Sequence, residues 1–108
     1  MAFEIRYTRL AQSQLKALRA FDRSAVITQI DNVLKNSTTL TSKARIKRLR
    51  QPAPTDFRLR VGEFRVFYNV ADDIVQIIQI MTKADSVLYY QEQYDDAPND
   101  DKPDDAHP

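Results

Sequence analysis

The chain has 108 residues, one glycine, no cysteine and a formal net charge of +1, a length suited to one small domain. The lack of cysteine excludes a disulfide framework and thiolate chemistry, and no apolar run reaches the ~20 residues of a membrane span. The N-terminus has no basic start followed by an apolar block, so we expect a cytoplasmic protein without a signal peptide and without membrane contact.

The small net charge is the sum of two opposite regions. Residues 1–91 hold 15 Lys and Arg against 8 Asp and Glu, a net of +7, whereas residues 92–108 hold one lysine against seven acidic residues, a net of −6. A basic body indicates a polyanionic partner such as nucleic acid. The acidic segment has little apolar surface to bury, so we expect one domain over residues 1–91 and a disordered tail over 92–108.

The first half of the chain predicts one strand and two helices. Residues 3–7 alternate apolar and polar side chains, which is typical of a strand. Thr8 is a suitable N-cap for a helix to about residue 20, and Asp22 or Ser24 for a second helix to about residue 36. The short link between the helices predicts an antiparallel pair. Their inward residues are Ala11, Leu15 and Leu18 in the first helix and Val26, Ile27, Ile30, Val33 and Leu34 in the second.

The second half predicts strands joined by tight turns. The basic run 43–50 is a short helical turn or an irregular strand, ended by the prolines that follow it. Residues 56–68 form a hairpin around Gly62-Glu63, because glycine at the first central position is typical of a type II′ turn. The β-branched residues 74–81 predict a central strand. Asp85 is the expected cap of a short last helix that carries Leu88, Tyr89 and Tyr90.

These elements predict an α+β fold. The N-terminal strand is followed by an antiparallel helix pair, which covers one face of a mainly antiparallel four-stranded sheet, and a short helix ends the domain. The other face of the sheet is expected to stay partly open.

The hairpin register places three arginines on that open face. Side chains alternate across a strand, so Arg58, Arg60 and Arg65 point away from the core, with Arg60 directly opposite Arg65. Like charges that face each other destabilise a sheet, so we expect an anion at this face. The planar guanidinium fork suits phosphate. A solvated sheet face is the alternative.

Further basic and aromatic residues extend this candidate site. Lys83 follows the central strand, where functional residues often lie. One of the adjacent Tyr89 and Tyr90 must point away from the core and can stack on a base. The basic run continues a nucleic-acid groove or is ordinary solvated surface, and its candidate RNA contacts are Arg45, Lys47, Arg48 and Arg50.

Several other chemistries are excluded by composition. The one histidine, His107, lies next to the end of the acidic tail, and there is no Cys/His set for zinc. A single glycine rules out a Gly-rich phosphate loop, and scattered acidic residues argue against a two-metal nuclease. We therefore expect neither a metal nor a cofactor.

The hairpin and its flanks resemble the RelE/ParE superfamily of bacterial type II toxins. The resemblance spans about residues 3–92. It rests on Leu49-Arg50, a proline-containing link, the segment FRLRVGEFRVFYNV, an acidic turn, a β-branched strand, Lys83 and Tyr90. It implies the RelE-like fold and a cognate antitoxin as partner in a toxin–antitoxin hetero-oligomer.

In the RelE branch, the resemblance implies cleavage of mRNA on the ribosome without a metal. The 2′-hydroxyl attacks the adjacent phosphate and leaves a cyclic phosphate and a free 5′-hydroxyl. The implied roles are phosphate contact for Arg65, charge stabilisation and proton transfer for Arg58 and Arg60, RNA contact for Arg50, and stacking near the reacting nucleotide for Tyr90. Two alternatives remain: a ParE-like inhibitor that binds DNA gyrase, and a degenerate member that binds only RNA or its antitoxin.

The chain departs from the family pattern at Ala84, where an arginine usually follows the last strand. Lys83 remains and is the candidate base, because arginine stays charged and accepts protons poorly. The missing guanidinium favours the two alternatives that do not cleave RNA, whereas the arginine hairpin favours cleavage.

Overall fold

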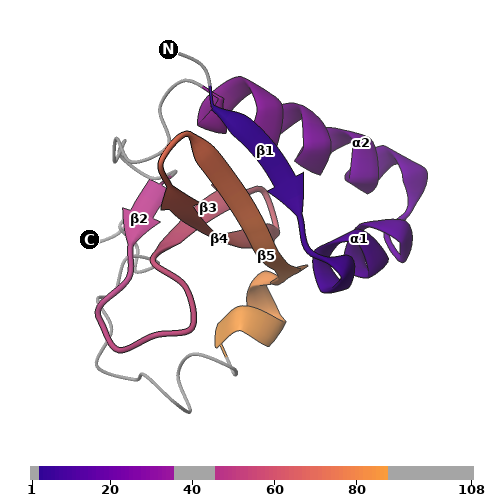
Figure 1. The fold of residues 1–108 in the computed structure, drawn as a ribbon. Coiled ribbons are helices and arrows are strands. Elements are labelled where there is room, and N and C mark those ends of the chain that lie inside the picture. The colour runs from indigo at the N-terminus through magenta and orange to yellow at the C-terminus, as the bar shows by residue number, and fades with distance from the viewer. Residues whose placement is uncertain (1–2, 36–45, 88–108) are drawn as a thin grey trace.

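The structure, a computed structural model, describes residues 3–35 and 46–87 as a layer of helices packed on a mixed sheet (Figure 1). The strand order is β1-β5-β4-β3-β2, with β1 parallel to β5 and all other neighbours antiparallel. The strands are β1 (Glu4–Tyr7), β2 (Ile46–Arg48), β3 (Phe57–Val61), β4 (Phe64–Ala71) and β5 (Ile74–Thr82). The α+β class and the mainly antiparallel sheet are confirmed.

The sheet has five strands, so the prediction of four strands is wrong. The additional strand is β2. Of the two structures predicted for the basic run, the described part is therefore a strand and not a helical turn. It pairs with β3 at Ile46↔Leu59, Lys47↔Arg58 and Arg48↔Phe57. Because β2 lies at the edge, β3 is an interior strand with a neighbour on each side.

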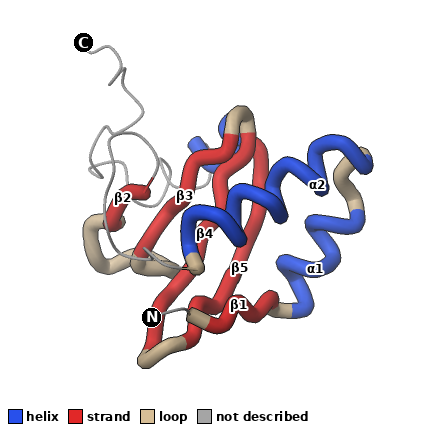
Figure 2. Tube along the Cα trace, turned by 90° about the horizontal axis from the view of Figure 1, so that it is seen from above, coloured by secondary structure: helices blue, strands red, loops and turns tan. Residues whose placement is uncertain are grey.

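The two helices lie on the same side of the sheet (Figure 2). The first is α1 (Arg9–Lys16), and Thr8 caps it as predicted, because its Oγ1 accepts a hydrogen bond of 3.1 Å from the amide of Ala11. The second is α2 (Ala20–Gln29), which continues as a π-helical turn, η1 (Ile30–Leu34). Its N-cap position is Arg19, so the prediction of Asp22 or Ser24 as the cap is wrong.

The apolar stripes of the helices meet one face of the sheet in a single core. The predicted inward residues of both helices are buried or partly buried there. The sheet residues that pack against them include Phe57, Leu59, Val61, Val66, Tyr68, Val75, Ile77 and Ile80. None of the helices in the described ranges is long and apolar enough to cross a membrane.

Arg23 fastens the end of α1 to the start of α2. Its Nε donates to the carbonyl of Leu15 at 3.0 Å, and its Nη2 donates to the carbonyls of Leu18 at 2.7 Å and Lys16 at 3.4 Å. The last carbonyls of a helix have no partners within the helix, and a cation is favourable near them. Arg23 therefore stabilises the tight link that makes the helix pair possible.

We predict that Arg23→Met lowers the free energy of unfolding by about 1 kcal/mol, because partly buried carbonyls at the end of α1 lose a charged donor. Urea denaturation of the full chain measures this. Arg19→Met is the matched control, since the Arg19 side chain is 84% exposed and has an ion pair of 3.6 Å with Asp22. That variant should stay within about 0.5 kcal/mol of the original chain. Equal losses in the two variants would contradict this role of Arg23.

Candidate nucleic-acid interface

The hairpin of β3 and β4 has the predicted register. Phe57 pairs with Tyr68, Arg60 with Arg65 and Val61 with Phe64. Gly62 has a φ of +56°, and among the described residues Asp72 is the one non-glycine residue with a positive φ. Glu63 therefore has a negative φ, and a positive φ followed by a negative φ is the pattern of the predicted type II′ turn.

Four basic side chains lie together on the sheet face opposite the helices. Lys47 pairs with Arg58 across β2 and β3, and Arg60 pairs with Arg65 across β3 and β4. Arg58 and Arg60 are two residues apart on β3, so they point to the same face. The pair Lys47–Arg58 therefore lies next to the pair Arg60–Arg65 on that face. We call the group Lys47, Arg58, Arg60 and Arg65 the basic sheet face.

The basic sheet face is less exposed than the sequence indicated. Arg58 is 5% exposed and Arg65 only 1%, whereas Arg60 and Lys47 are half-buried. The expectation of three arginines on an open face is therefore wrong for Arg58 and Arg65. The physical reason lies in the sheet order, because each buried arginine has a neighbouring strand on both sides.

Arg65 is bound to the hairpin turn. Its Nη1 donates hydrogen bonds to the carbonyls of Gly62, at 3.0 Å, and Phe64, at 2.9 Å. From the other side, the amide of Lys83 donates to the carbonyl of Glu63 at 2.7 Å. The turn is therefore held both by Arg65 and by the residue that follows β5.

Lys83 begins a short helix over residues 83–87, and its side chain is exposed beside the hairpin turn. The hydroxyl of Thr82 caps this helix by accepting a hydrogen bond of 3.1 Å from the amide of Asp85. The prediction of Asp85 as the cap is therefore wrong, because Asp85 lies inside the helix. Ala84 is exposed.

The predicted RNA contacts of the basic run are separated by strand β2. Lys47 belongs to the basic sheet face, but the next residue, Arg48, lies on the other face, with its guanidinium carbon 5.0 Å from the ring centre of Phe57. The structure therefore does not bring Arg48 together with the basic sheet face, and its RNA contact stays a prediction. Side chains alternate along a strand, and the sequence alone did not establish that this run is one.

Arg50 is exposed at the start of an ordered loop between β2 and β3. The loop is closed by the amide of Leu49, which donates to the carbonyl of Asp56 at 2.8 Å. Inside it, Gln51 accepts from the amide of Ala53 and donates to the carbonyl of Thr55. The predicted site residues Arg45, Tyr89 and Tyr90, and the predicted acidic tail 92–108, lie outside the described residues.

The positive charge of Arg58 acts on the core beneath it. Tyr68 is fully buried and stacks on Phe57, with ring centres 5.4 Å apart. Burial raises the pKa of Tyr68 well above its usual range, and the charge of Arg58 opposes this rise. Because the pKa is raised, Tyr68 stays neutral through the physiological range and remains compatible with the core.

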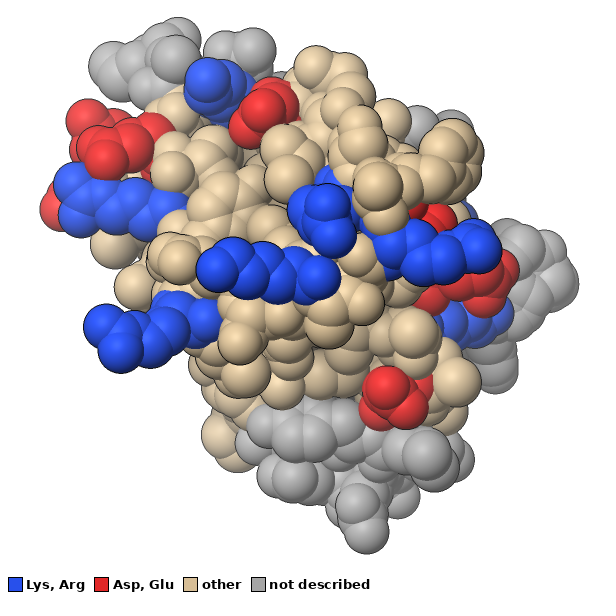
Figure 3. All heavy atoms as spheres, turned by 90° about the vertical axis from the view of Figure 1, so that its right-hand side faces the viewer, with Lys and Arg blue, Asp and Glu red and all other residues tan. Residues whose placement is uncertain are grey.

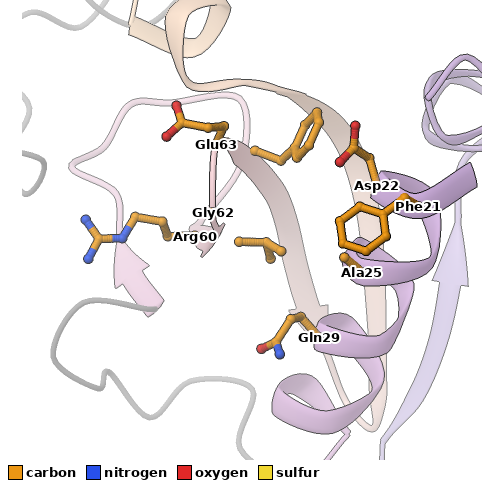
Figure 4. Close-up of a pocket in the computed structure, with 9 residues that line it drawn as sticks. Phe21, Asp22, Ala25, Gln29, Arg60, Gly62 and Glu63 are labelled. Carbon is orange, nitrogen blue, oxygen red and sulfur yellow. The ribbon is translucent and has the colours of Figure 1, made fainter. Parts of the chain in front are cut away.

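A groove lies next to the basic sheet face, between α2 and the hairpin (Figure 4). Its volume is about 510 Å³. Phe21, which is 78% exposed, lines the helix side. Figure 4 shows the guanidinium of Arg60 pointing away from α2, while Asp22 and Glu63 lie at the rim. Sequence reasoning missed this groove, although Phe21, an aromatic residue at the start of the second helix, was the available signal.

The helix side of the molecule also carries cations. Arg9, Lys16 and Arg19 are exposed there, and Figure 3 shows Lys and Arg side chains crossing this side, with Asp and Glu among them. Within the described ranges, no group of three or more His, Cys, Asp or Glu side chains is arranged to hold a metal ion. The basic sheet face is thus distinguished by the direct cross-strand pairing of its basic residues rather than by their number.

A family model described as the ParE toxin of the type II toxin–antitoxin system parDE matches residues 5–87. The chain belongs to this family. It is thus a toxin of the RelE/ParE superfamily, as its resemblance indicated. A comparison with curated proteins gives no match.

Solved structures of similar toxins share the fold of this toxin. The toxin–antitoxin complex RelBE2 of Mycobacterium tuberculosis matches with a TM-score of 0.64 and 22% identity, over 76% of this chain and 99% of that chain. The RelE–RelB complex of Pyrococcus horikoshii OT3 matches with a TM-score of 0.62 and 17% identity, over 77% and 97%. YafQ of E. coli matches with a TM-score of 0.52 and 14% identity, over 78% and 97%. These likenesses show the RelE-like fold.

Proposed function

We propose that this toxin acts in the cytoplasm by cleaving mRNA on the ribosome, without a metal. The observation that supports this most is the basic sheet face, where four basic residues from three adjacent strands are paired with one another. Lys83 lies against the turn that joins two of these strands. Such a cluster can stabilise the charge that develops on a phosphate during transfer. Basic side chains spread evenly over a surface would not provide this.

The proposed reaction is an attack by the 2′-hydroxyl of one nucleotide on its own 3′-phosphate. Lys83, as its neutral amine, accepts the proton of the 2′-hydroxyl and becomes an ammonium, the new P–O2′ bond forms, and the P–O5′ bond breaks. The products are a cyclic phosphate and a 5′-hydroxyl, whose proton comes from a general acid. Tyr90 is the candidate for stacking on the reacting nucleotide, with Tyr89 as a further RNA contact.

RNA affinity should distinguish two neighbouring residues of β2. We predict that Lys47→Gln weakens binding of a short RNA and makes it less dependent on salt, because one phosphate contact is lost. Arg48→Gln is the matched control, since Arg48 lies on the other face over Phe57. It should leave RNA affinity unchanged and lower stability by about 0.5–1 kcal/mol through loss of the cation–π contact. A larger loss of affinity in Arg48→Gln would contradict the proposed face.

Inhibition of DNA gyrase is the second candidate function, because the matching family model is the one described as ParE toxin. The decisive experiment adds the purified toxin to a translation reaction, maps mRNA cuts by primer extension, and runs a gyrase supercoiling assay in parallel. Our proposal expects ribosome-dependent cuts and normal supercoiling. Inhibited supercoiling with intact mRNA would establish the second function instead.

Ala84 offers a further test of the cleavage proposal. Its position is exposed in the helix that begins at Lys83, so an arginine fits there without disturbing the core. We expect Ala84→Arg to raise the rate of mRNA cleavage by about one to two decades, as an added electrostatic donor does. An unchanged rate would show that another residue already supplies this stabilisation.

We also propose a cognate antitoxin as partner, like the antitoxins in the RelBE2 and RelE–RelB complexes, and place an apolar side chain of it in the groove beside Phe21. The carboxylates of Asp22 and Glu63 at the rim disfavour an RNA strand there and favour a protein segment. A segment seated in this groove lies next to Arg60, so binding would also obstruct the basic sheet face.

We predict that Phe21→Ser weakens antitoxin binding by at least about tenfold, as expected for an aromatic anchor in a pocket. Leu10→Ser is the matched control, because Leu10 is a 50% exposed apolar residue of α1 that does not line the groove. Calorimetry with the cognate antitoxin measures both variants, and RNA affinity should be unchanged in each. Equal effects of the two substitutions would argue against the groove as the docking surface.

A further inference from the structure

Two arginines that face each other across the hairpin have different surroundings. Arg60 and Arg65 share a residue type, a face and a cross-strand pairing. Arg60 is half-buried, whereas Arg65 is 1% exposed. The two side chains can therefore be compared directly, because their burial differs while their position on the sheet is nearly the same.

The hydrogen bonds of Arg65 are directed at the backbone of the turn. Its Nη1 reaches the carbonyls of Gly62 and Phe64, which flank Glu63. The carbonyl of Glu63 in turn accepts a hydrogen bond of 2.7 Å from the amide of Lys83. A short chain of contacts therefore leads from the guanidinium of Arg65, through the turn, to the first residue of the last helix.

We propose that Arg65 is a positioning residue, which fixes the Gly62–Glu63 turn and through it Lys83, and that Arg60 makes the phosphate contact on this face. The inference rests on the proposed RNA-cleaving function. It reverses the role that the family resemblance implies for Arg65. The physical basis is that Arg65 is only 1% exposed, so its other N–H donors meet a phosphate at the surface only if the guanidinium moves outward. That movement would break the two bonds that Nη1 donates to the carbonyls of Gly62 and Phe64.

The test compares Arg60→Gln with Arg65→Gln in the full chain. For a short single-stranded RNA, Arg60→Gln should lower the slope of log affinity against log salt by about 0.7, the value for one phosphate contact. Arg65→Gln should leave this slope unchanged. A loss of slope in Arg65→Gln with none in Arg60→Gln would overturn the proposal.

Hydrogen exchange provides a readout that does not depend on RNA. Arg65→Gln should speed exchange of the Lys83 amide by about tenfold more than exchange of the Thr8 amide, which bonds to the carbonyl of Ile77 near the middle of β5. Arg60→Gln should change neither amide selectively. Equal acceleration of both amides in Arg65→Gln would show a merely global loss of stability and overturn the positioning role.

A measurement on the original chain covers the case in which Arg65→Gln does not fold. The Nε–Hε resonance of Arg60 should shift on addition of the RNA, and that of Arg65 should not; the reverse pattern would overturn the proposal. If the original chain binds no RNA, the proposed function fails together with the role of Arg60. Exchange at Lys83 would then still decide the role of Arg65.

Discussion

The register of the β3–β4 hairpin is the constraint on which the rest of the candidate site depends. Gly62 adopts a φ of +56°, which costs a glycine little and other residues more. This turn places Arg60 opposite Arg65. Because side chains alternate between the two faces of a strand, Arg58 lies on the same face as Arg60. A shift by one residue would send these cations into the core and the core residues to the surface.

The basic sheet face has an energetic cost, because like charges directly opposite each other destabilise a strand pair. The structure limits this cost by giving the cations different environments. Arg65 is bonded to the turn, while Arg60 and Lys47 keep part of their surface accessible. Such a division of roles suits phosphate binding, since a rigid frame holds the charges that meet the ligand.

The site and the groove meet at the same turn. Arg60 belongs to the basic sheet face and also lines the groove in which Phe21 is exposed. A partner in the groove and an RNA on the sheet face would therefore compete at one residue. If an antitoxin segment binds in the groove as we propose, this proximity would let it act on a site on the opposite face of the sheet.

Much of this arrangement could be predicted from the sequence, because the strongest local signals agree with the fold. One glycine between two segments of alternating apolar and polar residues determines the hairpin. Apolar residues three and four positions apart identify the inward faces of the helices. The predicted resemblance and the fold are confirmed by the family match and by the solved structures.

The remaining features depend on tertiary contacts that local patterns do not reveal. Strand β2 has only three residues, between the basic run and two prolines, and it exists because it pairs with β3. The burial of Arg58 follows from that pairing, and so does the separation of Lys47 from Arg48. Helix α2 begins before Asp22, at Ala20. Near this start, Arg23 donates hydrogen bonds to carbonyls five to eight residues earlier in the chain, which a local sequence pattern does not reveal.

The central claim is that the toxin retains facing arginines for an anionic ligand and not for its own stability. The most direct measurement is the free energy of unfolding of Arg60→Gln and of the original chain, at low and at high salt. Our account predicts that the variant is as stable as the original chain or up to about 1 kcal/mol more stable at low salt, and that salt removes the difference. A variant that is less stable by about 1 kcal/mol or more at low salt would show that Arg60 serves the fold, and would contradict the claim.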